Sequence, residues 1–249
     1  MVRGALLFLI CCALSAGAGG WARAADEAVL RVLVIENAPP MSYRDSGGQL
    51  TGFSVEVARA ICDEMGVKCH FDPVTQHVLT ELLSQGKADF AAAGLLDTPE
   101  RRAKFLFARP YYRSMTLWLA RAGVRPGQPG VKVAVVAGSA QDSYARKQGW
   151  VIHPVTTNGE LGQPMMSGEA QAILAPMMSA INVQAGEEIR QLELVATVMP
   201  APELTGDAAF GISPYRPDLQ KKINQALDRI KRNGTYDRIN SRFLPFRVS

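Results

Sequence analysis

Short apolar runs alternate with helical stripes along most of the chain, and this alternation limits the fold more than any other feature of the sequence. LRVLVI at 30–35 is rich in branched residues and is typical of a buried strand. Apolar residues at helical spacing follow in 53–66, and 68–74 is expected to be the next strand. A short amphipathic helix at 77–86 leads to a third strand at 87–96. Strands that alternate with helices predict an α/β lobe with a largely parallel sheet.

A second set of elements follows a boundary rich in proline and glycine at 116–130. Residues 131–149 repeat the order of strand, small-residue turn and helix. A late strand is expected at 207–213, and 216–234 has the clearest helical pattern of the chain. This order predicts two α/β lobes and leaves open whether the final helix returns to the first lobe.

The first 24 residues have the form of a secretory signal peptide. Arg3 precedes an apolar segment at 5–14, and the stretch ends on Ala22-Arg23-Ala24. The apolar segment is shorter than the roughly 20 residues that span a bilayer. A retained membrane anchor is the alternative. We therefore expect export, removal of residues 1–24 and a periplasmic mature protein.

The charge balance disfavours a nucleic-acid partner. The formal net charge is +4, and two of the basic residues, Arg3 and Arg23, lie in the expected signal peptide. The remaining charges nearly cancel and are evenly spread. We therefore expect no nucleic-acid partner. No metal site is expected, because His70 is the only other ligand type next to Cys62 and Cys69, and no cofactor is expected.

Two cysteines remain after the expected signal peptide. Cys62 and Cys69 are separated by DEMGVK, and Gly66 between them allows the chain to turn. An isolated pair at short range in an exported chain predicts a disulfide. Two buried free thiols are the alternative.

Four segments, in this order and spacing, resemble the extracellular solute-binding proteins of the polar amino-acid uptake family. They cover 30–61, 84–112, 131–141 and 208–239. The pair of cysteines is similar to the short disulfide of the lysine/arginine/ornithine/histidine-binding proteins.

The resemblance implies the two-lobed periplasmic-binding-protein fold of type II, an α/β fold. Two crossover segments, at about 117–121 and 208–212, would form a hinge that closes the lobes over a ligand. The first lobe would comprise 25–116 plus 212–249, and the second 117–211. A monomer that delivers its ligand to a membrane ABC permease is expected.

The resemblance gives Arg101 a role. In the family, the arginine of a T-x-x-R turn clamps the ligand's α-carboxylate, and Thr98 to Arg101 match that turn. A guanidinium offers a planar fork of donors that fits two carboxylate oxygens. An arginine in the first turn of a helix also opposes the helix dipole, which hints at a function independently of the family. Arg102 is expected to be a solvated neighbour.

Further ligand-binding residues are expected around this clamp. Ser139 begins a helix, where its hydroxyl and the free N–H groups bind an anion or simply cap that helix. The candidates besides Arg101 are Gly94, Ser139, Ala140, Met41, Tyr43 and His77. Met41 and Tyr43 are pocket walls or core residues, and His77 is a ligand contact or a surface residue.

Two positions depart from the family pattern. Leu96 stands where a hydroxyl commonly touches the carboxylate, and Pro176 stands where an acid usually pairs with the ligand's ammonium. A buried ammonium without a counter-charge is costly. Either the ligand lacks an α-amino group, or Glu36, Glu203 or Asp207 supplies the acid.

These features predict a periplasmic solute-binding protein, not an enzyme, which captures a small carboxylate-bearing solute, an amino acid or a related compound, for ABC-type uptake. One alternative is a binding protein that serves as a sensor or accessory without a transporter. Another is an enzyme on the same fold, such as cyclohexadienyl dehydratase.

Overall fold

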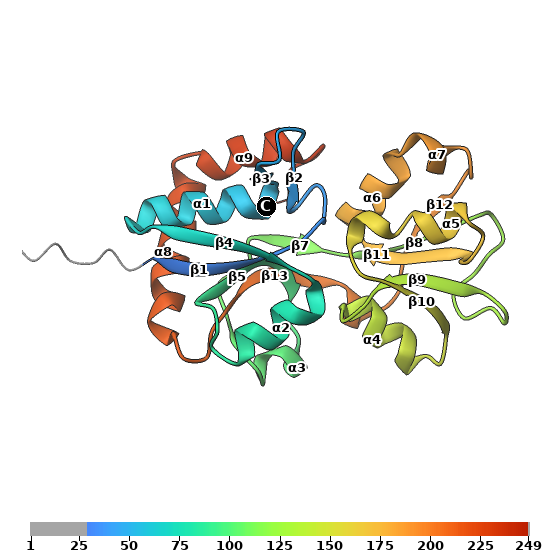
Figure 1. Cartoon of the computed structure of the whole chain (residues 1–249), viewed down its shortest axis with the longest axis horizontal. Helices are drawn as coiled ribbons and strands as arrows, with labels where there is room; N and C mark the ends of the chain where they lie inside the picture. The colour runs from blue at the N-terminus through green and yellow to red at the C-terminus, as the bar shows by residue number, and fades with distance from the viewer. Residues whose placement is uncertain (1–28, 249) are drawn as a thin grey trace, which may run out of the picture.

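Three parallel strands form the centre of the first of two α/β lobes, which lie side by side in the computed structural model (Figure 1). The structure describes residues 29–248, so the expected signal peptide lies outside the described residues. β1 (Leu30–Ile35) pairs in parallel with β4 (Cys69–Val74) and with β5 (Phe90–Leu96). The antiparallel strands are β13 (Gly206–Ile212), β6 (Leu106–Phe107) and β7 (Tyr112–Ser114).

Helices cover both faces of this sheet because alternate residues of each strand point to opposite sides. Val32 and Val34 pack in the core on one face, and Leu33 and Ile35 pack in the core on the other. The first face is covered by α1 (Phe53–Met65), α8 (Pro217–Arg232) and α9 (Thr235–Phe243). On the other side lie α2 (Gln76–Ser84) and α3 (Pro99–Arg102), and a small sheet of β2 (Tyr43–Arg44) and β3 (Leu50–Thr51) lies apart.

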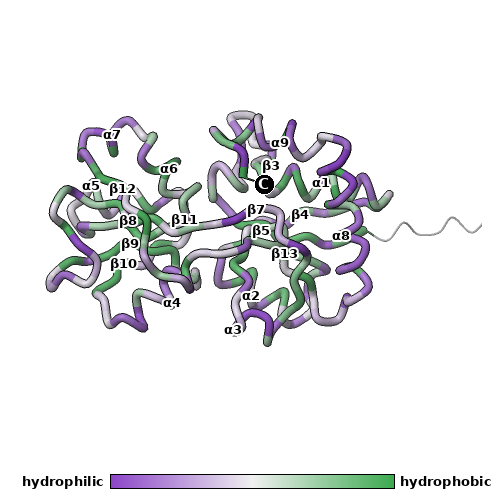
Figure 2. The backbone as a smooth tube through the Cα atoms, turned by 180° about the vertical axis from the view of Figure 1, so that it is seen from behind, coloured by the Kyte–Doolittle hydropathy of each residue, from purple (hydrophilic) through white to green (hydrophobic). Residues whose placement is uncertain are grey.

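The second lobe repeats this arrangement. β9 (Lys132–Val136) lies between the parallel strands β10 (Val151–Val155) and β11 (Ala172–Pro176), and the antiparallel strands β8 (Thr116–Ala120) and β12 (Val195–Val198) complete the sheet. Its helices and 3₁₀ turns are α4 (Ala140–Lys147), η1 (Asn158–Glu160), α5 (Gln163–Met166), α6 (Met177–Ala185), α7 (Glu187–Arg190) and η2 (Pro202–Leu204). Apolar stretches of chain gather along the strands of both sheets, with polar stretches on the outer helices (Figure 2).

The expected final helix is confirmed as α8, and it returns to the first lobe. Its five apolar positions are all buried, namely Leu219, Ile223, Ala226, Leu227 and Ile230. They pack in the same core cluster as the apolar side of α1. None of the helices within residues 29–248 is long and apolar enough to cross a membrane.

The crossovers lie earlier in the chain than the sequence predicted. The chain leaves the first sheet after Ser114 and joins the second sheet at Thr116, and it re-enters the first sheet at Gly206. The ranges 117–121 and 208–212 fall within β8 and β13, which hydrogen-bond along their lengths. Sheet membership therefore places the second change of lobe at about 206 rather than at 212.

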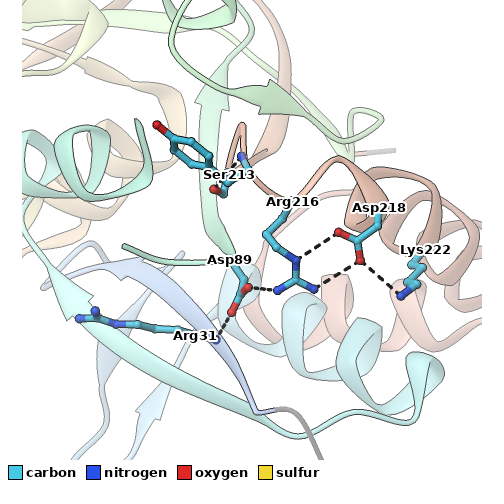
Figure 3. A network of polar contacts seen from close by, with 7 residues as sticks. Arg31, Asp89, Ser213, Arg216, Asp218 and Lys222 are labelled. Atoms are coloured by element: carbon cyan, nitrogen blue, oxygen red, sulfur yellow. Dashed lines mark hydrogen bonds and ion pairs between the residues drawn. The ribbon is translucent and has the colours of Figure 1, made fainter. Parts of the chain in front are cut away.

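An ion-pair network holds the start of α8 against the first sheet (Figure 3). Arg216 contacts the carboxylates of both Asp89 and Asp218, and Asp89 also accepts a hydrogen bond of 2.7 Å from the backbone N–H of Arg31. Hydrogen bonding from Arg216 lowers the pKa of Asp218. The network joins residues from β1, the segment before β5 and the helix that returns from the second lobe.

The expected disulfide between Cys62 and Cys69 is present. It joins the end of α1 to the start of β4, and Gly66 ends α1 in the left-handed conformation that glycine adopts without strain. The disulfide therefore links the two ends of the turn between α1 and β4.

We predict that the double variant Cys62→Ser/Cys69→Ser loses about 2–3 kcal/mol of unfolding free energy, because opening the short loop returns entropy to the unfolded chain. The melting temperature should fall by roughly 4–12 °C in thermal unfolding followed by circular dichroism. The parent protein treated with reductant should melt like the variant. Equal melting temperatures for the oxidised parent and the variant would show that the bond contributes nothing.

Candidate functional site

The carboxyl ends of parallel strands from both sheets face each other between the lobes. Ile35 ends β1 and Leu96 ends β5, whereas Val136 ends β9 and Pro176 ends β11. All four residues line one small pocket. Because ligands of open α/β sheets bind beyond the carboxyl ends of their strands, the topology places the candidate site here.

Two adjoining cavities occupy this region. The inner pocket, with a volume of about 80 Å³, has Met41, Gly94 and Pro176 among its walls. The outer groove, with a volume of about 840 Å³, has His77 and Lys104 among its walls. The walls of both cavities include Leu96, Arg101, Ser139 and Ala140.

Arg101 lies where the two cavities meet, and local structure fixes its position. The strand β5 ends at Leu96, and Thr98 caps α3 by accepting a hydrogen bond of 3.3 Å from the backbone N–H of Arg101. The guanidinium then turns back and donates from Nη1 to the carbonyl oxygen of Leu96, at 3.2 Å. The T-x-x-R turn thus aims this side chain into the space between the lobes.

The guanidinium of Arg101 is largely buried, although the residue keeps some exposed surface, and it has no counter-ion in the described chain. Burial of the guanidinium lowers its pKa, although the nearby charge of Glu100 opposes this shift. Among residues 29–248, no carboxylate forms an ion pair with Arg101. An unpaired buried cation is unfavourable, so this position favours an anion.

Arg102 differs sharply from its neighbour. It is exposed and donates two short hydrogen bonds to the carboxylate of Asp97, at 2.5 and 2.6 Å from Nε and Nη2. Hydrogen bonding to Asp97 raises the pKa of Arg102. Arg102 itself lines neither cavity, and it lies in a surface ion pair with Asp97 on the wall of the outer groove.

Ser139 faces both cavities and also caps its own helix. Its hydroxyl oxygen accepts a hydrogen bond of 3.1 Å from the backbone N–H of Asp142. The carboxylate of Asp142 in turn accepts from the backbone N–H of Gly138, at 3.0 Å, so one donor of the turn is already occupied. The capping role is observed, and the hydroxyl of Ser139 keeps a proton to donate to a ligand.

The other candidates divide between the cavities. Met41 and Gly94 line the inner pocket, His77 lines the outer groove, and Ala140 lines both. Tyr43 lines neither cavity. It lies in β2, where it pairs with Thr51 of β3, one residue beyond the tight turn that carries Met41 to the pocket.

Glu36, Glu203 and Asp207 were considered as replacements for the acid that the family usually has at the position of Pro176. All three lie outside the inner pocket. Glu203 and Asp207 line the outer groove, and Glu36 lines neither cavity. Asp207 is exposed and lies 3.5 Å from Arg113. No group of three or more metal-ligating side chains forms a metal site within the described part of the chain.

Several residues of the inner pocket had no signal in the sequence. The Oγ atom of Ser42 and the Nε2 atom of Gln76 are buried there without a hydrogen-bond partner. Tyr112 also lines the pocket, and burial raises its pKa to about 12. The Tyr112 hydroxyl lies so close to Gly94 that a Cβ atom on Gly94 would be 2.1 Å from its oxygen.

Direct contacts hold the lobes together beside the cavities. The Nδ2 atom of Asn37 donates to the hydroxyl of Thr157, at 3.0 Å, and the backbone N–H of Gly159 donates to the carbonyl oxygen of Asn37, at 2.9 Å. A Cβ atom on Gly138 would lie 3.1 Å from the Cα atom of His77. The structure is therefore a closed arrangement of the lobes.

Comparisons with known proteins agree with this architecture. The family model described as "Bacterial extracellular solute-binding proteins, family 3" matches residues 30–246. The L-arginine-binding protein of Pseudomonas aeruginosa is 26% identical, with 90% of this chain and 91% of that protein covered. The amino-acid-binding protein AabA of Dichelobacter nodosus is 30% identical, and the match covers 100% of this chain and 98% of AabA.

Solved structures share the two-lobed fold. An ancestral arginine-binding protein bound to arginine has a TM-score of 0.76 and 26% identity, with 87% of this chain and 98% of that chain covered. A second structure is the ancestral amino-acid-binding protein AncCDT-1, described as a precursor of cyclohexadienyl dehydratase. It has a TM-score of 0.75 and 29% identity, with 86% of this chain and 95% of the AncCDT-1 chain covered. The predicted fold class is confirmed.

We predict that Gly94→Ala destabilises the protein by about 1–3 kcal/mol, because its Cβ atom would lie 2.1 Å from the Tyr112 hydroxyl oxygen. Tyr112→Phe in the same chain should recover part of the loss, as measured by calorimetry. Gly206→Ala is the matched control, since a Cβ atom there meets nothing within 4 Å. If Gly94→Ala is as harmless as the control, the close approach of Tyr112 is wrong.

Proposed function

This chain belongs to the bacterial extracellular solute-binding proteins of family 3, and we propose that it captures a small carboxylate-bearing solute between its two lobes. The solute is an amino acid or a related compound. The observation that carries this proposal is the buried guanidinium of Arg101, which lies at the meeting point of two interlobe cavities without a counter-ion. A carboxylate supplies the missing charge and accepts two parallel hydrogen bonds from the guanidinium fork.

Closure follows from contacts on both sides of the ligand. Arg101 holds the carboxylate on the first lobe, and Ser139 and the nearby backbone of the second lobe add donors only when the lobes approach. A ligand that touches both lobes stabilises the closed arrangement relative to the open one. The contacts of Asn37 with Thr157 and Gly159 support the closed state in the same way.

The named relatives support an amino acid or a close analogue as the ligand class. The proteins reported above are called arginine-binding or amino-acid-binding. We propose a periplasmic location after removal of residues 1–24, a monomeric state, and a membrane ABC permease that recognises the closed form. A sensor or accessory role without a permease would use the same closure.

Binding rather than catalysis is the proposed role. AncCDT-1, the precursor of cyclohexadienyl dehydratase, makes an enzyme the second candidate. Proton transfer at such a site needs a positioned acid or base, most often an imidazole or a carboxyl group. The described residues that line the inner pocket include no carboxyl and no imidazole side chain, whereas His77 and several carboxylates line the outer groove. The absence of such a group from the inner pocket favours binding there.

We predict that Arg101→Gln weakens the best ligand from a panel of amino acids and simple carboxylates by about 10- to 150-fold, because a charged hydrogen-bonded contact is lost. Isothermal titration calorimetry measures the change. The ligand-free variant should be at least as stable as the parent, since an uncompensated buried charge has been removed.

Arg102→Gln is the matched control, because this arginine is exposed and paired with Asp97. It should leave ligand affinity within about twofold of the parent, as expected of a surface ion pair. Equal losses of affinity in the two variants, or none in either, would contradict the role of Arg101.

A further inference from the structure

The inner pocket contains one charged side chain. Of the described residues that line it, Arg101 alone is ionised at neutral pH, and the remaining walls are aliphatic residues, hydroxyls, amides and the phenol of Tyr112. A zwitterionic amino acid would bring an ammonium group to within one carbon of the carboxylate that Arg101 holds. That ammonium would lie close to a like charge in a largely desolvated space.

The acids near this pocket lie on its outer side. Asp97 is bound by two short hydrogen bonds from Arg102, and Asp207 is paired with Arg113. Glu81, Glu100 and Glu203 are exposed on the wall of the outer groove, and the charge of Glu100 acts on Arg101 from there. An ammonium in the inner pocket therefore has no carboxylate among the lining residues to neutralise it.

Among the described residues, the wall of the inner pocket contains no acid, but it does contain two neutral polar atoms without hydrogen-bond partners. The Oγ atom of Ser42, a residue only 1% exposed, and the Nε2 atom of Gln76 are buried in the pocket wall with no hydrogen-bond partner. The amide nitrogen can only donate, and the hydroxyl both donates and accepts. Buried polar atoms are almost always satisfied, so the amide nitrogen of Gln76 fits an oxygen atom on the ligand, and the hydroxyl of Ser42 fits either an oxygen or an N–H group.

The size of the pocket also limits the ligand. Its volume of about 80 Å³ is about a tenth of the roughly 840 Å³ of the outer groove. This space holds a short aliphatic chain with one further oxygen. Leu96, Leu174 and Met178 provide apolar wall for such a chain.

We propose that the ligand is a small monocarboxylate whose remaining part is uncharged, namely a short-chain 2-hydroxy or 2-oxo acid, rather than the corresponding amino acid. This proposal rests on the proposed function, because it assumes that Arg101 holds the carboxylate. The 2-oxygen accepts a hydrogen bond from Gln76, and the carbon chain lies against the apolar wall.

Two matched sets of probes test the proposal on the purified protein. L-lactate, pyruvate and L-alanine differ only at the second carbon, as do 2-hydroxyisovalerate, 2-oxoisovalerate and L-valine. Calorimetric titration should show the hydroxy or oxo acid binding at least about tenfold tighter than the amino acid in one set or both, a difference that corresponds to about 1.4 kcal/mol.

Pro176→Asp should reverse this preference. Pro176 lines the pocket and is the N-cap residue of α6, a position where aspartate is favourable, so the variant is expected to fold. The added carboxylate supplies the counter-charge for an ammonium, and the amino acid should gain at least about tenfold relative to the hydroxy acid. Pro176→Asn also caps the helix but carries no charge, so the amino acid should gain much less in this variant than in Pro176→Asp.

The possible results separate this inference from the proposed function. Tighter binding of L-alanine and L-valine to the parent overturns the inference, and loss of that binding in Arg101→Gln would leave the proposed function standing. An unchanged preference in Pro176→Asp also overturns the inference. No binding of any of the six probes up to about 10 mM overturns the inference as well, and the wider panel with Arg101→Gln then decides the proposed function separately.

Discussion

Arg101 carries its positive charge into the space between the lobes, where burial lowers its pKa and no carboxylate of the described chain pairs with it. The carbonyl oxygen of Leu96 accepts one of its hydrogen bonds, which fixes the side chain without neutralising it. The protein therefore holds a cation ready for an anion that comes from outside. The other features of the site act on that anion by shaping the space around it, adding donors or bringing the second lobe near.

The topology explains why this cation meets the second lobe. Each sheet places three parallel strands next to an antiparallel strand, β13 in the first and β8 in the second. The chain changes lobe immediately before each of these two strands, and the two lobes lie side by side (Figure 1). The carboxyl ends of β5 and β11 line the same pocket. The pocket between them brings together residues more than 70 positions apart in the chain, such as Arg101 and Pro176.

The sequence predicted the features that depend on local patterns. The alternation in β1 and the apolar positions of α8 identify buried faces, and the short separation of Cys62 and Cys69 indicated their disulfide. The sequence analysis placed the crossovers too late in the chain, because whether a strand belongs to one sheet or the other depends on pairing partners that are distant in the sequence. The roles of Ser42, Gln76 and Tyr112 were likewise not predictable, since each depends on atoms that meet only after both sheets and the interlobe space have formed.

The most direct test of the central claim is a crystal structure of the protein grown with a carboxylate that raises its melting temperature. A bound carboxylate should lie between the lobes with both oxygens about 2.7–2.9 Å from guanidinium nitrogens of Arg101, the usual range for charged hydrogen bonds. A ligand bound elsewhere, or a carboxylate between the lobes that does not contact Arg101, would contradict the account.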